Sequence, residues 1–179
     1  GWSDAPMRAP DGRPAAMGLA LHQAFDTVVA QVVTVSLSAE RRVRVHRVVM
    51  AVDCGLAVHP DGVRQQMEGA VIFGLSAALH GEVRIVQGRV MTGNFHEYPL
   101  LSMRDTPSID VHILPSAEPP AGVGEPGLPP VAPAVANAIA RLTGERLRSL
   151  PLRPTRASRF VAEGTDSTER AERVEQQTP

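Results

Sequence analysis

The chain has 179 residues and a formal net charge of −1 at pH 7, and its 18 basic side chains other than histidine are all arginine. Because these arginines are dispersed, the charge does not predict a polyanionic partner. Aromatic residues make up 3% of the chain, which argues against a stacking platform for single-stranded nucleic acid. The length suits one domain or a piece of a larger protein.

Cysteine and histidine usage limits the metal chemistry. Cys54 is the single cysteine, which excludes an internal disulfide, a Cys-based zinc cluster and a four-Cys iron–sulfur site within this chain. The histidines show no metal-ligand spacing, so we predict no metal-ligating residues. No apolar run approaches the ~20 residues of a membrane span. The Gly-Trp-Ser start carries no signal-peptide pattern, so we expect a fragment whose natural N-terminus lies elsewhere in a longer chain. The sequence leaves open whether the parent protein is cytoplasmic or periplasmic.

The first part of the chain predicts strands. Residues 1–16 are rich in Pro, Gly, Ala and Asp, which is typical of a linker or loop. The apolar run Met17–His22 predicts a short strand. Thr27–Ser38 and Arg42–Asp53 alternate in polarity and are rich in valine, as half-buried strands are. The short polar link between them predicts an antiparallel hairpin.

A helix is expected next. Apolar residues recur at intervals of three and four over Val63–His80, with Asp61 as the expected N-cap and Gly81 as the C-cap. Gly69 and Gly74 would weaken an exposed helix, so we expect them to allow close packing against a sheet or a cofactor.

The rest of the chain is more varied. A small hairpin is expected over 82–92 and a strand over Ile109–Leu114. A helix is expected over about 130–143, with prolines in its first turn. Arg146–Leu152 predicts a last short strand. The polar residues 153–179 predict a disordered or loosely attached tail.

These elements define an α+β fold of antiparallel hairpins with two main helices packed on the sheet. The most informative stretch is the loop Gly122–Gly127, in which glycines and prolines surround the carboxylate of Glu125 just before a helix. A carboxylate held on a stiff loop can serve as a general base. A helix cap or a solvated loop residue is the simpler interpretation on chemistry alone.

The run GVGEPGLPPVAPAVANAI at 122–139 resembles the C-terminal signature of the molybdenum hydroxylases, the xanthine dehydrogenase/aldehyde oxidase family, in particular the large beta subunits of isoquinoline 1-oxidoreductase type. The resemblance extends from about Gly18 to Leu152, and it implies that residues 17–152 are the C-terminal part of a molybdopterin-binding domain. It implies that Glu125 is the base beside the molybdenum, with Gly122, Val123 and Gly124 at the cofactor.

Two further stretches match the same family. The run from Gln65 to Gly69 resembles its Q-x-E-G helix, in which the glutamine that Gln66 matches lies at the molybdenum–pterin end of the cofactor. An amide can donate to an oxo or phosphate oxygen and accept from a pterin N–H without adding charge; the alternative is a helix residue facing solvent. The run from Asp53 to Pro60 matches a strand-to-turn segment, in which Cys54 is expected to be a small buried hydrophobe.

The resemblance implies a hydroxylase that acts on an N-heterocycle or an aldehyde, with water as the oxygen source. It implies a molybdenum–pterin cofactor, in the cytosine dinucleotide form, and 2Fe-2S clusters on a small iron–sulfur partner subunit. The rest of the large subunit would be a further partner, so the fragment alone is expected to be inactive. The alternative is a non-catalytic α+β binding or assembly module, or an inactive fragment of that fold. We expect Glu125 to face a concave surface within reach of Gln66.

Overall fold

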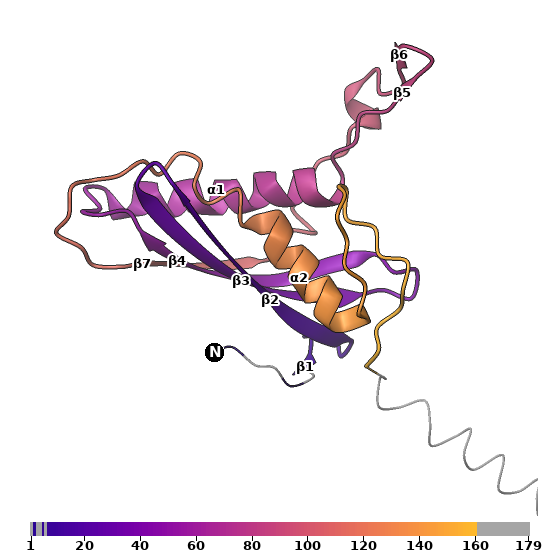
Figure 1. The fold of residues 1–179 in the computed structure, drawn as a ribbon, viewed down its shortest axis with the longest axis horizontal. Helices are drawn as coiled ribbons and strands as arrows, with labels where there is room; N and C mark the ends of the chain where they lie inside the picture. The colour runs from indigo at the N-terminus through magenta and orange to yellow at the C-terminus, as the bar shows by residue number, and fades with distance from the viewer. Residues whose placement is uncertain (1, 3–4, 6, 161–179) are drawn as a thin grey trace, which may run out of the picture.

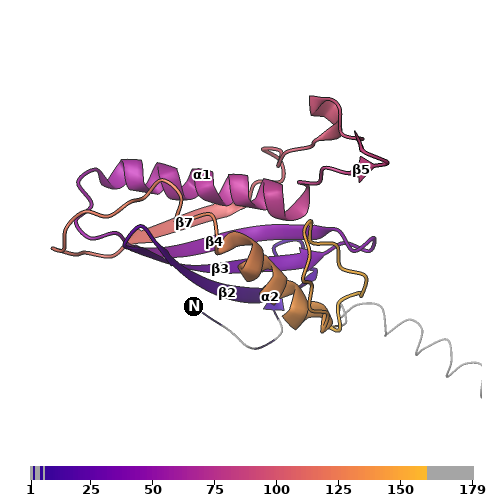
Figure 2. The same cartoon turned by 45° about the horizontal axis from the view of Figure 1, so that its top comes forward.

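The structure, a computed structural model, describes residues 2, 5 and 7–160. Its centre is a five-stranded sheet in the order β1-β2-β3-β4-β7, and helices α1 and α2 lie over the same face of this sheet (Figures 1 and 2). The strands are β1 (Met7–Arg8), β2 (Pro14–Ala24), β3 (Thr27–Leu37), β4 (Val43–Asp53) and β7 (Ser108–Ile113). The expected α+β class is confirmed.

The predicted hairpin of β3 and β4 is present, with a register shift at Thr34/Val35. The expectation of a linker over 1–16 is wrong in part, because Met7–Arg8 forms β1 and β2 begins at Pro14. Proline is tolerated at the first position of a strand, where no ladder donor is needed. The turn from β2 to β3 has positive φ at Phe25 and Asp26, the conformation of a tight two-residue hairpin.

The predicted strand at 109–114 is also present, as β7, but its pairing was not foreseen. β7 lies parallel to β4, from Arg47 opposite Ser108 to Val52 opposite Ile113. Parallel neighbours need a crossover connection, which here contains α1. The C-terminal ends of β4 and β7 therefore lie together at one edge of the sheet, namely the edge formed by the ends of the strands.

Helix α1 (Pro60–Leu79) is the predicted helix, but its caps differ from those expected. Asp61 is not the N-cap; its carboxylate pairs with Arg64 at 2.8 Å. The cap is His59, whose Nδ1 accepts from the Gly62 N–H at 2.7 Å. The reason is that proline takes the first helical position, which keeps His59 non-helical and lets its ring turn back over the first turn.

At its other end α1 stops one residue earlier than expected. His80, rather than Gly81, is the C-cap, and the N–H groups of both residues donate to the Ser76 carbonyl. Beyond this point the chain leaves the body of the molecule and returns to it at Leu101, whose N–H donates to the Ser76 hydroxyl. Residues 83–100 project between these points (Figure 1). They hold the predicted small hairpin, β5 (Ile85–Val86) and β6 (Arg89–Val90), and the short helix η1 (Phe95–Glu97).

Helix α2 (Val131–Thr143) confirms the second predicted helix and ends at Gly144, which has φ 78°. It packs directly on β2 at Gly18. A Cβ atom at Gly18 would lie 2.0 Å from the Ala134 carbonyl oxygen and 2.4 Å from the Ala138 nitrogen. Only glycine therefore lets this helix approach the sheet so closely.

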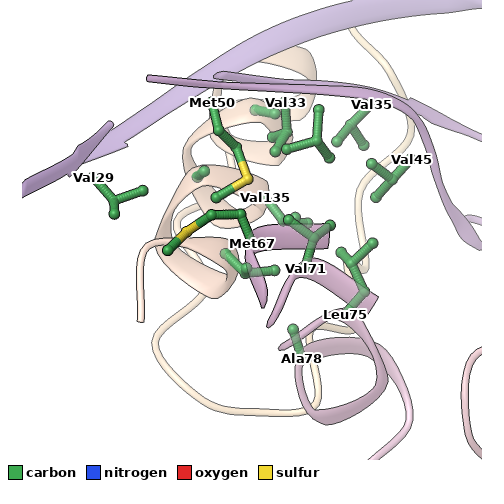
Figure 3. Packing of buried hydrophobic residues seen from close by; sticks show 14 of the residues in the cluster. Val29, Val33, Val35, Val45, Met50, Met67, Val71, Leu75, Ala78 and Val135 are labelled. Carbon is green, nitrogen blue, oxygen red and sulfur yellow. The ribbon is translucent and has the colours of Figure 1, made fainter. Parts of the chain in front are cut away.

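The core lies between the sheet and the two helices (Figure 3). Both sulfurs drawn in Figure 3 belong to methionines at its centre, Met50 of β4 and Met67 of α1. Around them gather apolar side chains from β3, β4, α1 and α2: Val29, Val33, Val35, Val45, Val71, Leu75, Ala78 and Val135.

The strand expected over Arg146–Leu152 is absent from the structure, which has a loop there. Its backbone is tied to the end of α1, not to the sheet, by a bond from Leu152 N to Ala78 O at 2.7 Å. The expected loose tail also differs over 153–160, where Phe160 packs against the small cluster of Ala16, Leu37 and Leu142. The remainder of that tail, 161–179, lies outside the described residues.

Candidate functional site

The segment that follows β7 carries the glycine-rich loop, and main-chain bonds hold it along one edge of the sheet. The bonds connect it to the end of β4, to the turn after β4 and to the β2–β3 turn: Leu114 N to Val52 O, Leu56 N to Glu118 O, Ala121 N to Cys54 O, and Gly122 N to Phe25 O, all within 2.8–3.0 Å. Because β4 and β7 are parallel, this segment and the turn that leads into α1 leave the sheet at the same edge.

Glu125 lies at the start of a tight turn on this segment, closed by a bond from Leu128 N to Glu125 O at 2.9 Å. Its side chain is exposed, whereas Gly127 two residues later is buried. A Cβ at Gly127 would lie 2.8 Å from the Met67 sulfur and 3.0 Å from the Ala70 Cβ of α1. The turn therefore rests directly on the helix.

A pocket of about 330 Å³ lies between this turn and α1. The helix contributes Gln66, Gly69, Ala70 and Phe73, and the loop contributes Gly124, Glu125, Leu128 and Pro129. Glu125 and Gln66 thus line one concave surface, as the sequence predicted.

The other predicted cofactor-binding residues lie beside this pocket, not in it. Val123 lines a second pocket of about 330 Å³, which also reaches Gln66 and includes His59. Gly122 packs on the β2–β3 turn, since a Cβ there would lie 2.8 Å from the Phe25 Cβ. Gly122 therefore admits another part of this chain at its Cα.

The backbone is bare on both walls of the first pocket. An added Cβ at Gly69 or at Gly124 would meet no atom within 4 Å. A ligand could approach the main chain closely at both positions. The amide of Gln66 can donate and accept, whereas Ala70, Phe73, Leu128 and Pro129 are apolar. The lining therefore suits a large group that has both a hydrogen-bonding edge and an apolar face.

The start of α2 offers few free N–H donors to a group near Glu125. Val131 already donates its N–H to Leu128 O, and Pro133 has none. Pro130 is the N-cap and makes no side-chain cap bond. Attraction of a nearby carboxylate by free N–H groups is correspondingly limited.

Cys54 is buried at the end of β4, as predicted. Burial raises the pKa of its thiol, and the negative charge of Asp53 acts in the same direction. A thiol held neutral in this way is a poor nucleophile. Among the described residues no group of three or more His, Cys, Asp or Glu side chains could hold a metal ion, and no helix is long and apolar enough to cross a membrane.

Sequence reasoning missed Phe73, which is 68% exposed at the rim of the first pocket. Its signal was available in the helical spacing. Residues 66, 69, 70 and 73 lie on one stripe of a helix, so a ligand that extends two helical turns from Gln66 reaches Phe73.

Comparison with known proteins identifies the family of the chain. Residues 16–107 match the family model of the molybdopterin cofactor-binding domain. The chain is 43% identical over 157 residues to isoquinoline 1-oxidoreductase subunit beta of Brevundimonas diminuta, covering 87% of this chain and 20% of that protein. It is 42% identical over 118 residues to a membrane-bound aldehyde dehydrogenase (pyrroloquinoline-quinone) of Gluconacetobacter polyoxogenes, covering 66% and 15% respectively.

Among solved structures, the chain matches quinoline 2-oxidoreductase of Pseudomonas putida 86 with a TM-score of 0.64 and 22% identity, over 86% of this chain and 19% of that one. That likeness shows the fold. The chain belongs to the molybdopterin cofactor-binding domains of the molybdenum hydroxylase family. It spans a fifth or less of the length of these relatives.

Proposed function

We propose that this chain is the C-terminal, base-bearing part of a molybdenum hydroxylase large subunit that hydroxylates an N-heterocycle or an aldehyde, with water as the oxygen source. The observation that carries the proposal is the pocket shared by Glu125 and Gln66, with bare backbone at Gly69 and Gly124. The relatives support the substrate classes, since they are named for isoquinoline and for aldehyde oxidation.

The pocket lining fits a molybdenum–pterin cofactor, which supplies the two-electron oxidation when bound. The amide of Gln66 would hold its polar edge, and the main chain at Gly124 and Gly69 would admit its bulk. The cytosine dinucleotide form is our specific expectation for this cofactor. Val123 would reach it through the neighbouring pocket.

Glu125 would act as the general base. Its carboxylate accepts the proton of the attacking oxygen nucleophile, so that negative charge is available for bond formation as the substrate carbon is attacked. Such a base contributes roughly 10²–10⁴-fold to the rate. The carboxylate is exposed in this chain, so exclusion of water from it would fall to the rest of the large subunit.

The electrons must leave the site, and this chain has one cysteine. We therefore place the 2Fe-2S clusters on a small iron–sulfur partner subunit. The chain on its own is expected to be inactive.

The test uses the full-length large subunit that contains this segment, co-expressed with its iron–sulfur partner. We expect Glu125→Gln to retain molybdenum and to lose at least 10²-fold in turnover of an N-heterocycle or aldehyde, because the amide cannot accept the proton. Glu118→Gln is the matched control, since it makes the same change on the same exposed segment outside the pocket and should leave turnover unchanged. Molybdenum analysis and steady-state kinetics are the measurements.

Equal turnover in the Glu125→Gln variant and the wild type would remove Glu125 from the mechanism. Absence of molybdenum from both would favour the alternative of a non-catalytic binding or assembly module that keeps the fold.

A further inference from the structure

We propose that Gln31, in the middle of β3, is a positioning residue that holds the turn bearing Glu125. This inference rests on the proposed function of Glu125, which Gln31 does not touch. It concerns a residue that lies on the sheet, 96 positions before Gly127 in the sequence.

The contact is a single hydrogen bond that reaches the turn from the sheet. Gln31 is fully buried, and its Nε2 donates to the main-chain oxygen of Gly127 at 2.5 Å. A carbonyl oxygen can only accept, so the amide nitrogen of Gln31 must face it. The turn runs from Glu125 to Leu128 and is closed by the bond from Leu128 N to Glu125 O. The bond from Gln31 fixes the Gly127 carbonyl, which belongs to the last peptide of this turn.

The same glycine is held from the other side by α1. The Met67 sulfur and the Ala70 Cβ leave no room for a side chain at Gly127. The turn is therefore fixed between the sheet and the helix, and Gln31 supplies the polar contact. A turn held on two sides keeps its first residue in a defined place over the pocket.

Packing alone does not explain a glutamine at this position. Its inward-facing neighbours on β3, Val29 and Val33, are apolar and fully buried. The second polar atom of the amide, Oε1, is buried and has no hydrogen-bond partner among the described residues. A half-satisfied buried amide destabilises a fold relative to an apolar side chain of similar size. The bond to Gly127 accounts for its presence.

A general base must lie within hydrogen-bond reach of the proton that it accepts, and a misplacement of ~1 Å can cost about 10²-fold in rate. We therefore expect Gln31→Met to lower kcat by 10-fold or more, with KM and molybdenum content unchanged. Gln31→Glu should recover most of kcat, because a buried carboxyl is neutral and keeps an O–H donor for the Gly127 carbonyl.

The first experiment is amide hydrogen exchange on the full-length subunit. We expect Gln31→Met to speed exchange of the Leu128 N–H by at least 10-fold, since that N–H closes the turn. Val33→Ala, which opens the core on the same face of β3 without touching the turn, is the control and should leave Leu128 unchanged. Gln31→Leu, a second side chain without a donor, replaces Gln31→Met if the latter does not fold.

The second experiment is steady-state kinetics of the same variants in the complex with the iron–sulfur subunit. If Gln31→Met leaves exchange of the Leu128 N–H unchanged, the proposal is overturned. It is also overturned if exchange is faster but kcat stays at the wild-type value, because holding the turn would then have no effect on catalysis. Failure of Gln31→Glu to recover activity would overturn the role of the donor. If the wild type binds no molybdenum, the proposed function fails, while the exchange comparison still decides whether Gln31 holds the turn.

Discussion

At the scale of single residues, side-chain hydrogen bonds decide much of what the sequence could not reveal. Gln31 and His59 each act through a contact that depends on tertiary structure or on local chain reversal, not on a periodic pattern. His46 is a third case. It lies at the register shift in β4, and its Nε2 lies 2.7 Å from the hydroxyl of Ser36.

His46 makes a pH prediction possible. Burial lowers the pKa of His46 from the ordinary value of 6.5. The charge of Asp11 raises this pKa in part, and the charges of Arg44 and Arg13 lower it further. A histidine whose pKa is lower in the folded state binds fewer protons there than in the unfolded state. The folded state therefore loses stability as pH falls below about 6.5.

We expect the melting temperature to decrease as the pH is lowered from 7.5 to 5.5, and to decrease less in His46→Gln than in the wild type. His112→Gln, at an exposed position on β7, is the matched control and should keep the wild-type slope. Equal slopes in all three proteins would show that His46 does not carry the effect.

At the scale of the elements, local sequence patterns predicted where the longer strands and helices lie, because local periodicity determines these elements. The valine-rich alternation of β3 and β4 and the helical spacing of α1 and α2 gave these elements to within a few residues. Pairings between distant segments escaped, which is why β1, the first residues of β2 and the parallel partner of β4 were missed. The segment 146–152 was predicted as a strand because leucines recur among its polar residues. Burial of Leu152 beside α1 leaves the same kind of apolar signal as burial in a sheet.

The contact of α2 with β2 supplies a test at this scale. We expect Gly18→Ala to cost about 3 kcal/mol or more of unfolding free energy, because the new methyl group would meet backbone atoms of α2 that cannot rotate away. Urea denaturation of the chain measures the change.

The matched control is Gly69→Ala, in which the new methyl group meets no atom of the chain. It should raise the unfolding free energy by about 0.5–1 kcal/mol, since alanine favours a helix over glycine. A loss of molybdenum from the full-length subunit with this variant would then report a ligand in the pocket. Similar behaviour of the two variants in urea would contradict the packing described at Gly18.

At the scale of the whole molecule, the described end of the chain belongs to the fold. Arg159 donates to the Leu142 and Arg141 carbonyls near the end of α2, and Glu145 accepts from Thr155 and Arg156. Composition alone predicted a loose tail from residue 153, because polar residues give no apolar pattern even where they pair with carbonyls.

Phe160 tests this attachment. We expect Phe160→Ala to lower the unfolding free energy by about 1–2 kcal/mol, because its ring is partly buried against Leu142 and Ala16. Phe95→Ala is the control, since that ring is 94% exposed on the projecting segment and its loss should change nothing measurable. Equal effects in thermal or urea unfolding would mean that residues 153–160 do not contribute to the stability of the domain.

The candidate site was predictable in part. The convergence of Glu125 and Gln66 was expected from the family resemblance, and the structure places both on one pocket. The physical cause could not be read from the sequence, because it is the parallel pairing of β4 with β7 that brings the loop and the start of α1 to one edge.

The pairing of β4 with β7 also lets the projecting segment and the pocket change independently in evolution. The ladder between β4 and β7 sets where both walls of the pocket begin, and it does so whatever the length of the segment that projects between α1 and β7. Insertions, deletions or new surfaces in 83–100 can therefore accumulate without moving Glu125 relative to Gln66. One lineage can alter what the projection contacts while another alters the pocket, and neither change forces the other.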